Sequence, residues 1–189
     1  MLFTTSYQAP FCRITKSSNG KQLTGLWLDK QESLTPSSFP LPENTTMSDI
    51  FKPAETWLDC YFEGKCPGFT PDLTLDGTPF QLEVWNLLKT IPYGETVCYK
   101  DIAREIARIR KIKCMSAQAV GRAIGQNPIS LIIPCHRVIG SNGNLTGYAG
   151  GIHNKLRLLT LEGVSPSRLF MPGEKAYADY TEVSLFRCK

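Results

Sequence analysis

The sequence predicts a mixed α/β protein with two parts, a small N-terminal α/β unit and a helical C-terminal unit that contains a helix-turn-helix. Three observations support this. The first 30 residues alternate apolar and polar positions around turn residues, as strands do. Two short amphipathic helices follow residue 98. Basic residues outnumber acidic ones 11 to 5 in residues 79–165 but are outnumbered 9 to 6 in residues 1–78. The expected bounds are 1–74 and 75–165, with a tail at 166–189.

The N-terminal unit is expected to contain a hairpin and an amphipathic helix. "SSNGK" at 17–21 is typical of a turn, and "TGLWLD" at 24–29 fits the strand after it. A loop rich in proline and serine is expected at 35–46. "MSDIFKPAETWLDCYFEG" then places seven apolar residues at helical spacing, and Gly64 is the expected C-cap. Residues 65–79 read as a turn-rich linker.

The C-terminal unit is expected to begin with two amphipathic helices. Thr78 and Gln81 form a capping box with Pro79 at the first helical position. The apolar face of this helix consists of Phe80, Val84, Trp85 and Leu88. The apolar stripe of the next helix, in "CYKDIAREIARIR", consists of Tyr99, Ile102, Ile106 and Ile109.

A second short helix, "SAQAVGRAIG" with Ser116 as N-cap, completes the helix-turn-helix after the basic turn "KIKCM". At 100° per residue, Val120 and Ile124 share one side with Ala117. The other side carries Gln118, Gly121, Arg122 and Gly125. Two helical glycines cost roughly 0.8–1 kcal/mol each relative to alanine, so another body is expected to approach this face closely. A neighbouring helix and a DNA minor groove both fit.

Composition restricts the class of protein. With 189 residues and 42% hydrophobic content, the chain can bury one substantial core or two small ones. The start lacks the pattern of a signal peptide, and no apolar run reaches the roughly 18 residues of a membrane span, so a soluble cytoplasmic or nuclear protein is expected. The seven cysteines are scattered and no CxxC occurs, which predicts reduced, mostly buried thiols and no metal site.

The stretch "NPISLIIPCHRVIGSNG" at 127–143 places Cys135 beside His136, one of only two histidines. Adjacent side chains of an extended segment point to opposite faces. The Cys135 thiol and the His136 imidazole would therefore be connected by a bridging water or brought together by a local turn after Pro134. His136 could accept the thiol proton while a carboxylate orients its other nitrogen, which predicts a partial thiolate at neutral pH. A buried structural cysteine beside a solvated histidine is the alternative.

Four motifs together carry a family resemblance. "NPISLIIPCHRVIG", "GYAGG" beginning twelve residues after the cysteine, "LLTLEG", and upstream "GTPFQLEVWNLLKTIPYGETVCY" resemble the O6-alkylguanine-DNA alkyltransferases from about Leu75 to Gly163. The resemblance implies an N-terminal ribonuclease H-like domain and a C-terminal winged-helix domain that enters the DNA minor groove. It also implies that a monomer flips O6-alkylguanine, or O4-alkylthymine, out of double-stranded DNA and accepts the alkyl group irreversibly, once per chain and without a cofactor.

The resemblance also implies catalytic roles for single residues. Cys135 is the alkyl acceptor, and His136 is the base that acts through a water molecule. Glu162 orients His136, and Asn127 braces the active-site turn. Tyr99 assists rotation of the nucleotide and protonates the departing guanine.

The remaining implied contacts line the base pocket or touch DNA. The pocket residues are Val138, Tyr148 and Ala149, and the DNA-contacting residues are Ala117, Gln118, Gly121 and Arg122. Gln118 departs from the family, because many relatives carry an arginine there that inserts into the base stack. The turn within "ARIRKIKCM" is also longer and more basic than usual.

Two other functions fit the sequence less well. A cysteine hydrolase would need a partner histidine far downstream and an oxyanion loop, but only His153 follows His136. A non-catalytic protein that binds alkylated bases and flags them for other repair pathways would share the fold, but such proteins lack the cysteine. Cys135 therefore favours the transferase.

Overall fold

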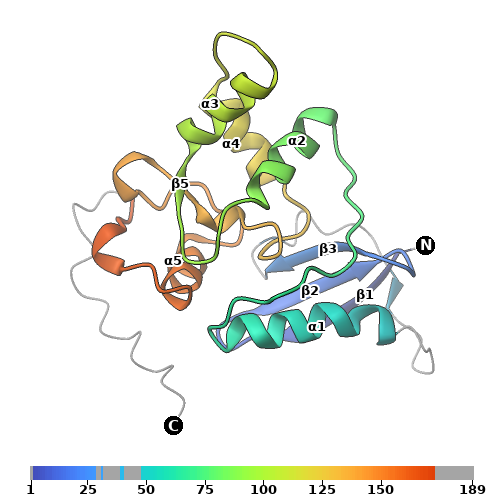
Figure 1. Cartoon of the computed structure of the whole chain (residues 1–189). Helices are drawn as coiled ribbons and strands as arrows, with labels where there is room; N and C mark the ends of the chain where they lie inside the picture. The colour runs from blue at the N-terminus through green and yellow to red at the C-terminus, as the bar shows by residue number, and fades with distance from the viewer. Residues whose placement is uncertain (1, 29–30, 32–38, 41–47, 173–189) are drawn as a thin grey trace.

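A four-stranded sheet and one long helix form the N-terminal unit of the computed structural model, which describes residues 2–28, 31, 39–40 and 48–172 (Figure 1). The sheet order is β3-β2-β1-β4. β1 pairs with β2 and β2 with β3 in antiparallel fashion, whereas β1 and β4 are parallel. The elements of this unit are β1 (Phe3–Gln8), β2 (Arg13–Ser18), β3 (Leu23–Leu28), β4 (Phe39–Pro40) and α1 (Ser48–Phe62).

Local sequence explains these elements. The predicted hairpin is β2–β3, and its turn is fixed by Asn19, whose side-chain oxygen accepts the amides of Lys21 and Gln22. The predicted helix is α1, and Gly64 ends it with a positive φ of 77°. Most of the loop expected at 35–46 lies outside the described residues, but residues 39–40 form β4 instead of loop.

The C-terminal unit contains three packed helices, a short parallel sheet and a final helix (Figure 1). These are α2 (Pro79–Leu88), β5 (Val97–Cys98), α3 (Tyr99–Ile109), α4 (Ala117–Gly125), β6 (Val138–Ile139) and α5 (Ile152–Leu161). The capping box at Thr78 and Gln81 and the cap at Ser116 are both present, as predicted. The indole of Trp85 donates to the carbonyl of Ala123 at 2.8 Å and so fixes α2 against α4.

One expected buried position is wrong. Ile109 is 48% exposed, because it lies in the last turn of α3, which extends beyond the core. Ala117 shares a side of α4 with Val120 and Ile124 but is exposed, because it begins the helix one turn before the first buried residue, Val120. Helical periodicity identifies a face but does not tell where along that face the core ends.

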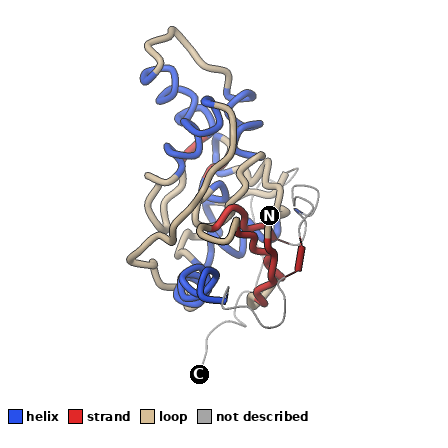
Figure 2. Tube along the Cα trace, turned by 90° about the vertical axis from the view of Figure 1, so that its right-hand side faces the viewer, coloured by secondary structure: helices blue, strands red, loops and turns tan. Residues whose placement is uncertain are grey.

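The two units share one continuous core, and β3 is attached to the segment that precedes Cys135. The amide of Leu26 donates to Pro128 at 2.9 Å, and Ser130 donates back to Leu26 at 2.8 Å. Figure 2 shows the strands beside the helical part of the chain. This arrangement confirms the predicted mixed α/β fold. Within the described residues, no helix has both the length and the apolar character that a membrane crossing requires.

Candidate active site

A tight turn carries the Cys-His pair. After α4 ends, the chain passes through Asn127, and residues 135–137 form a 3-10 helix directly after Pro134. The Asn127 side chain donates to the carbonyl of Ile133 at 2.8 Å and to Cys135 Sγ at 3.2 Å, and it accepts the amide of Ile129 at 3.0 Å. The local turn after Pro134, one of the two connections expected between Cys135 and His136, is therefore present. The hydrogen bonds of Asn127 hold the ends of this segment together.

Cys135 is buried, with 4% of its surface exposed. Burial raises the pKa of its thiol, while the Asn127 hydrogen bond and the Lys155 charge act in the opposite direction without overcoming it. The expected partial thiolate at neutral pH is thus wrong for the protein without DNA. Burial depends on the tertiary fold, and the motif alone does not report it.

His136 is fully buried and forms a 2.7 Å hydrogen bond from Nε2 to Glu162 Oε1. Burial lowers the pKa of His136, although Glu162 opposes the shift, so the imidazole is neutral near pH 7. Because an ionised carboxylate can only accept, Nε2 carries the proton and Nδ1 keeps a lone pair. Among the described residues Nδ1 has no hydrogen-bond partner, which leaves it able to accept a proton.

Glu162 accepts five hydrogen bonds. Besides His136, its donors are the guanidinium of Arg137 at 2.8 and 3.1 Å, the hydroxyl of Tyr61 at 2.7 Å and the amide of Gly94 at 3.0 Å. Burial raises the pKa of Glu162, but His136 and Arg137 outweigh burial and lower this pKa to about 2. Gly94 has a φ of 78°, and a Cβ there would lie 2.8 Å from the Glu162 carbonyl, so only glycine fits.

Tyr61 brings the N-terminal unit into this network. It lies on α1, is fully buried and stacks on Trp57 with ring centroids 5.2 Å apart. Its hydroxyl donates to Glu162 and lies 3.3 Å from His136 Nε2. Burial and the Glu162 carboxylate hold the pKa of Tyr61 well above its usual value, so the hydroxyl remains a donor. Sequence reasoning missed this residue, because 101 positions separate it from its partner.

Replacing Tyr61 with phenylalanine is expected to lower the free energy of unfolding by about 1.5–3 kcal/mol, the typical contribution of a hydrogen bond to a charged group. The substitution keeps the ring and removes only the donor. Urea denaturation of the two proteins measures the difference, and Tyr93→Phe is a suitable control, because its hydroxyl makes only a long 3.3 Å bond to a carbonyl. Equal stability of the Tyr61 variant and the parent would exclude a contribution from this bond.

Lys155 is a second residue that the sequence did not single out. It lies on α5, is fully buried, and its ammonium donates to the carbonyls of Val138 at 2.5 Å and Thr146 at 3.0 Å. Burial lowers the pKa of Lys155 to about 8, so it remains mostly protonated at neutral pH. Its positive charge favours a thiolate at Cys135. No local pattern marks a lysine on an apolar helix face as buried.

Tyr99 begins α3 and faces the loop before Tyr148. Its hydroxyl donates to the carbonyls of Thr146 and Gly147, both at 3.0 Å. Burial raises the pKa of Tyr99 to about 12, so the phenol remains protonated. Gly147 has a φ of 68°, and a Cβ there would lie 2.9 Å from this hydroxyl.

The other expected pocket residues differ in exposure. Val138 is fully buried, and its carbonyl is held by Lys155. Tyr148 is 8% exposed, and its ring and that of His136 are T-shaped, with centroids 6.5 Å apart. Ala149 is exposed. The structure thus places Tyr148 against the Cys-His turn and Ala149 at the surface beside it.

The expected DNA-contacting residues lie on the outer side of α4. Ala117, Gln118 and Arg122 are exposed, and Gly121 is partly exposed. The position of a Cβ on Gly121 would be 3.7 Å from the ring of Tyr99. This helix face therefore adjoins the tyrosine that begins α3.

The described cysteines do not share one environment. Cys12 is buried, but Cys66 and Cys114 are exposed, so the expectation of mostly buried thiols is wrong for them. Among the residues that the structure describes, no three histidine, cysteine or acidic side chains are grouped as a metal site would need.

The fold and this site define a class: two-domain proteins in which a helix-turn-helix unit carries a buried cysteine beside a His-Glu pair. Residues 79–164 match the family model described as the DNA binding domain of 6-O-methylguanine DNA methyltransferase, and residues 2–76 match that of its ribonuclease-like domain. The chain belongs to the 6-O-methylguanine DNA methyltransferase family.

Individual relatives are similar over most of the chain. It is 42% identical over 163 residues to a methylated-DNA–protein-cysteine methyltransferase of Mycobacterium leprae, covering 86% of this chain and 93% of that protein. A Methanosarcina acetivorans protein of the same name is 49% identical over 115 residues, 61% of this chain and 70% of the relative. The crystal structure of Mycobacterium tuberculosis OGT in complex with DNA is 42% identical with a TM-score of 0.70, covering 89% and 94% of the two chains.

Proposed function

We propose that the protein repairs double-stranded DNA by transferring the alkyl group of O6-alkylguanine, and of O4-alkylthymine, to its own Cys135. The observation that carries the proposal is the neutral His136: its Nδ1 has no hydrogen-bond partner in the part of the chain that the structure describes, while Glu162 accepts from Nε2. A histidine in this state can accept the thiol proton. The similarity to the DNA-bound M. tuberculosis structure supports DNA as the partner.

The chemistry proceeds in one displacement. The proton of Cys135 passes through a water molecule to His136 Nδ1, and the imidazolium is stabilised by Glu162. The thiolate attacks the alkyl carbon, so a C–S bond forms while the bond from that carbon to guanine O6 breaks. The electron pair moves to the guanine, which takes a proton from Tyr99 or water. The thioether that remains cannot be hydrolysed by a neighbouring group, so each chain reacts once.

Burial of the thiol fits a reaction that starts only when the flipped base is present. In the protein without DNA, the raised pKa keeps Cys135 protonated and protects it from other electrophiles. Lys155, at hydrogen-bond distance from the loop that contains Thr146, supplies the positive charge that stabilises the thiolate once it forms. Tyr99, Tyr148 and the backbone of Val138 would enclose the base.

Stoichiometry tests the proposal. Duplex DNA with a radiolabelled methyl group on guanine O6 is expected to transfer label to protein until one group is bound per chain, after which transfer stops. Continued release of label into solution would indicate hydrolysis instead. Tight binding without any transfer would indicate the non-catalytic flagging role.

The finer aspects of this function are also proposals. We propose functional units at 1–74 and 75–165 and a tail from 166, with residues 166–170 still packed through Leu169 on the C-terminal unit. Limited proteolysis within 65–79 would support the first boundary.

A single chain supplies every side chain of the site, so we propose a monomer, which sedimentation with and without duplex DNA tests. We propose that it acts in the cytoplasm, on the nucleoid in a bacterium, and fluorescence microscopy tests this.

Gln118 is expected to act in base rotation. The Gln118 amide would fill the space that the rotated base leaves in the DNA stack by shape and hydrogen bonds alone. An arginine in that space is also attracted by the negative charge of the phosphates. Gln118→Ala should slow repair of duplex DNA by about tenfold, about 1.4 kcal/mol of activation free energy. Reaction with the free alkylguanine base, which needs no rotation, should hardly change. Gln118→Arg should accelerate the duplex reaction. Equal slowing of Gln118→Ala on both substrates, measured as single-turnover rates, would assign Gln118 to the fold or the active site instead.

A further inference from the structure

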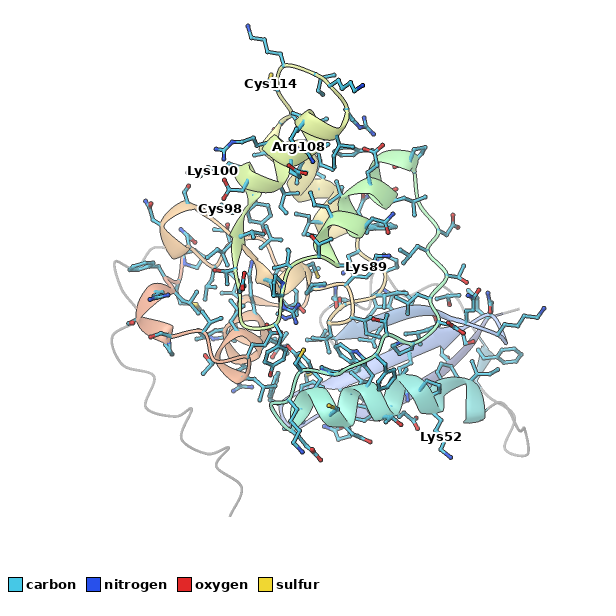
Figure 3. The ribbon with its side chains drawn as sticks, viewed as in Figure 1. Lys52, Lys89, Cys98, Lys100, Arg108 and Cys114 are labelled. Carbon is cyan, nitrogen blue, oxygen red and sulfur yellow. The ribbon has the colours of Figure 1, made fainter. Side chains whose placement is uncertain are left out.

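A groove of about 440 Å³ lies between α3 and the turn that leads to α4. Its lining is partly apolar and partly basic. The apolar part consists of the buried Ala103 and Ala107 and the more exposed Ile112 and Met115. The rim consists of Lys100, Arg104, Arg108 and Lys113. Figure 3 shows Lys100 and Arg108 on α3 and Cys114 in the turn beyond them, on the side of the molecule away from Lys52.

Charge is concentrated around this groove. Residues 100–115 contain six basic and two acidic side chains, and their net charge of +4 equals the formal net charge of the whole chain. The other residues are therefore neutral in sum. A surface with an excess of positive charge attracts a polyanion and orients it there.

The ion pairs within this segment leave its basic side chains available to a phosphate. Arg104 pairs with Asp101 at 3.2 Å and Arg108 with Glu105 at 2.6 Å, on an exposed helix surface where such pairs contribute little. A phosphate can compete for both guanidinium groups. Lys100 and Lys113 are exposed, and neither forms an ion pair in the part of the chain that the structure describes.

The groove also adjoins the residues proposed to act on DNA. Lys100 directly follows Tyr99, and the last lining residue is Ala117, the first residue of α4. A duplex that lies along the outer side of α4 would continue past this rim.

We propose that the groove binds the sugar-phosphate backbone of the duplex beside the lesion, with phosphates on Lys100 and Lys113 and a deoxyribose against Ile112. The proposal rests on the proposed function and extends the DNA-binding surface beyond α4. It also gives a role to the long basic turn that departs from the family pattern. The contact is independent of sequence, because it reaches only the backbone.

The test compares two double variants of the full-length protein that remove the same charge. Lys100→Gln/Lys113→Gln alters the groove, and Lys52→Gln/Lys89→Gln alters exposed lysines elsewhere (Figure 3). Binding to an undamaged duplex is measured over a range of salt concentrations. Each lost phosphate contact reduces the slope of log affinity against log salt by about 0.9, so the groove variant should lose about 2 in slope and about tenfold in affinity at low salt.

The control double variant should retain the slope of the parent. Lys100→Arg/Lys113→Arg, which keeps both charges of the groove, should also retain it. Equal slopes for the groove and control variants would overturn the proposal. So would a groove variant that binds duplex normally but no longer binds polyglutamate, which would identify an acidic polypeptide as the occupant. Alkyl transfer by the parent decides the proposed function separately, because the groove is judged only from the difference between the variants.

Discussion

Replacing Cys135 with serine is expected to abolish alkyl transfer and to leave duplex binding close to that of the parent. A serine hydroxyl is a harder nucleophile with a much higher pKa than a thiol, and the neutral His136 is too weak a base to ionise it. The substitution changes one buried atom, and the exposed residues of α4 that are proposed to contact DNA are untouched. The variant should therefore bind the duplex like the parent but transfer no alkyl group.

Single-turnover transfer and equilibrium binding on the same methylated duplex measure the two effects. Cys66→Ser is the matched control, because Cys66 is an exposed thiol outside the Cys-His turn and its loss should change neither quantity. Transfer retained by the Cys135 variant would show that another residue accepts the alkyl group.

The second large effect concerns His136 and Glu162. His136→Gln and Glu162→Gln are each expected to slow transfer by about 100-fold or more, the range for loss of a general base. In the proposed mechanism Glu162 acts through His136, because its hydrogen bond to Nε2 favours the tautomer with Nδ1 unprotonated. The double variant should therefore be little worse than the slower single variant. Rate losses that multiply would show that the two residues do not act as a unit.

Glu162→Gln should also destabilise the fold, because Arg137 then remains buried without its anion. Loss of one partner of a buried pair typically costs about 3–5 kcal/mol. The folded pKa of Glu162, about 2, lies below the unfolded value of about 4.3, so its contribution of about 3 kcal/mol is present above pH 4.3 and is lost as the pH falls toward 2. Urea unfolding between pH 7 and pH 2 should show this loss in the parent and not in the variant. Identical pH dependence in both proteins would refute the assignment.

Local signals in the sequence were sufficient for many elements of the fold. The capping box at Thr78, the cap at Ser116 and the end of α1 at Gly64 depend on residues within one turn of each other. The turn at Pro134 was one of two expected links between Cys135 and His136. These features depend on neighbours along the chain, which is why their residue types were informative.

The electrostatics of the site could not be predicted in the same way. Tyr61 reaches Glu162 from another unit, and the raised pKa of Cys135 follows from burial by several elements. Arg137 lies within the sequence motif, but its hydrogen bond to Glu162 depends on the position of the C-terminal end of α5, which the motif does not specify. The family resemblance predicted Cys135 and His136 as the reacting pair, whereas contacts between distant segments determine the pKa shifts of these two residues.

Peptide mass spectrometry after incubation with a duplex that contains O6-methylguanine tests the central claim most directly. We predict one methyl group per chain, located on the peptide that contains Cys135, with the exposed Cys66 and Cys114 unmodified as internal controls. An unmodified Cys135 peptide after the lesion has disappeared from the DNA would contradict the account, as would methyl groups spread over the exposed thiols.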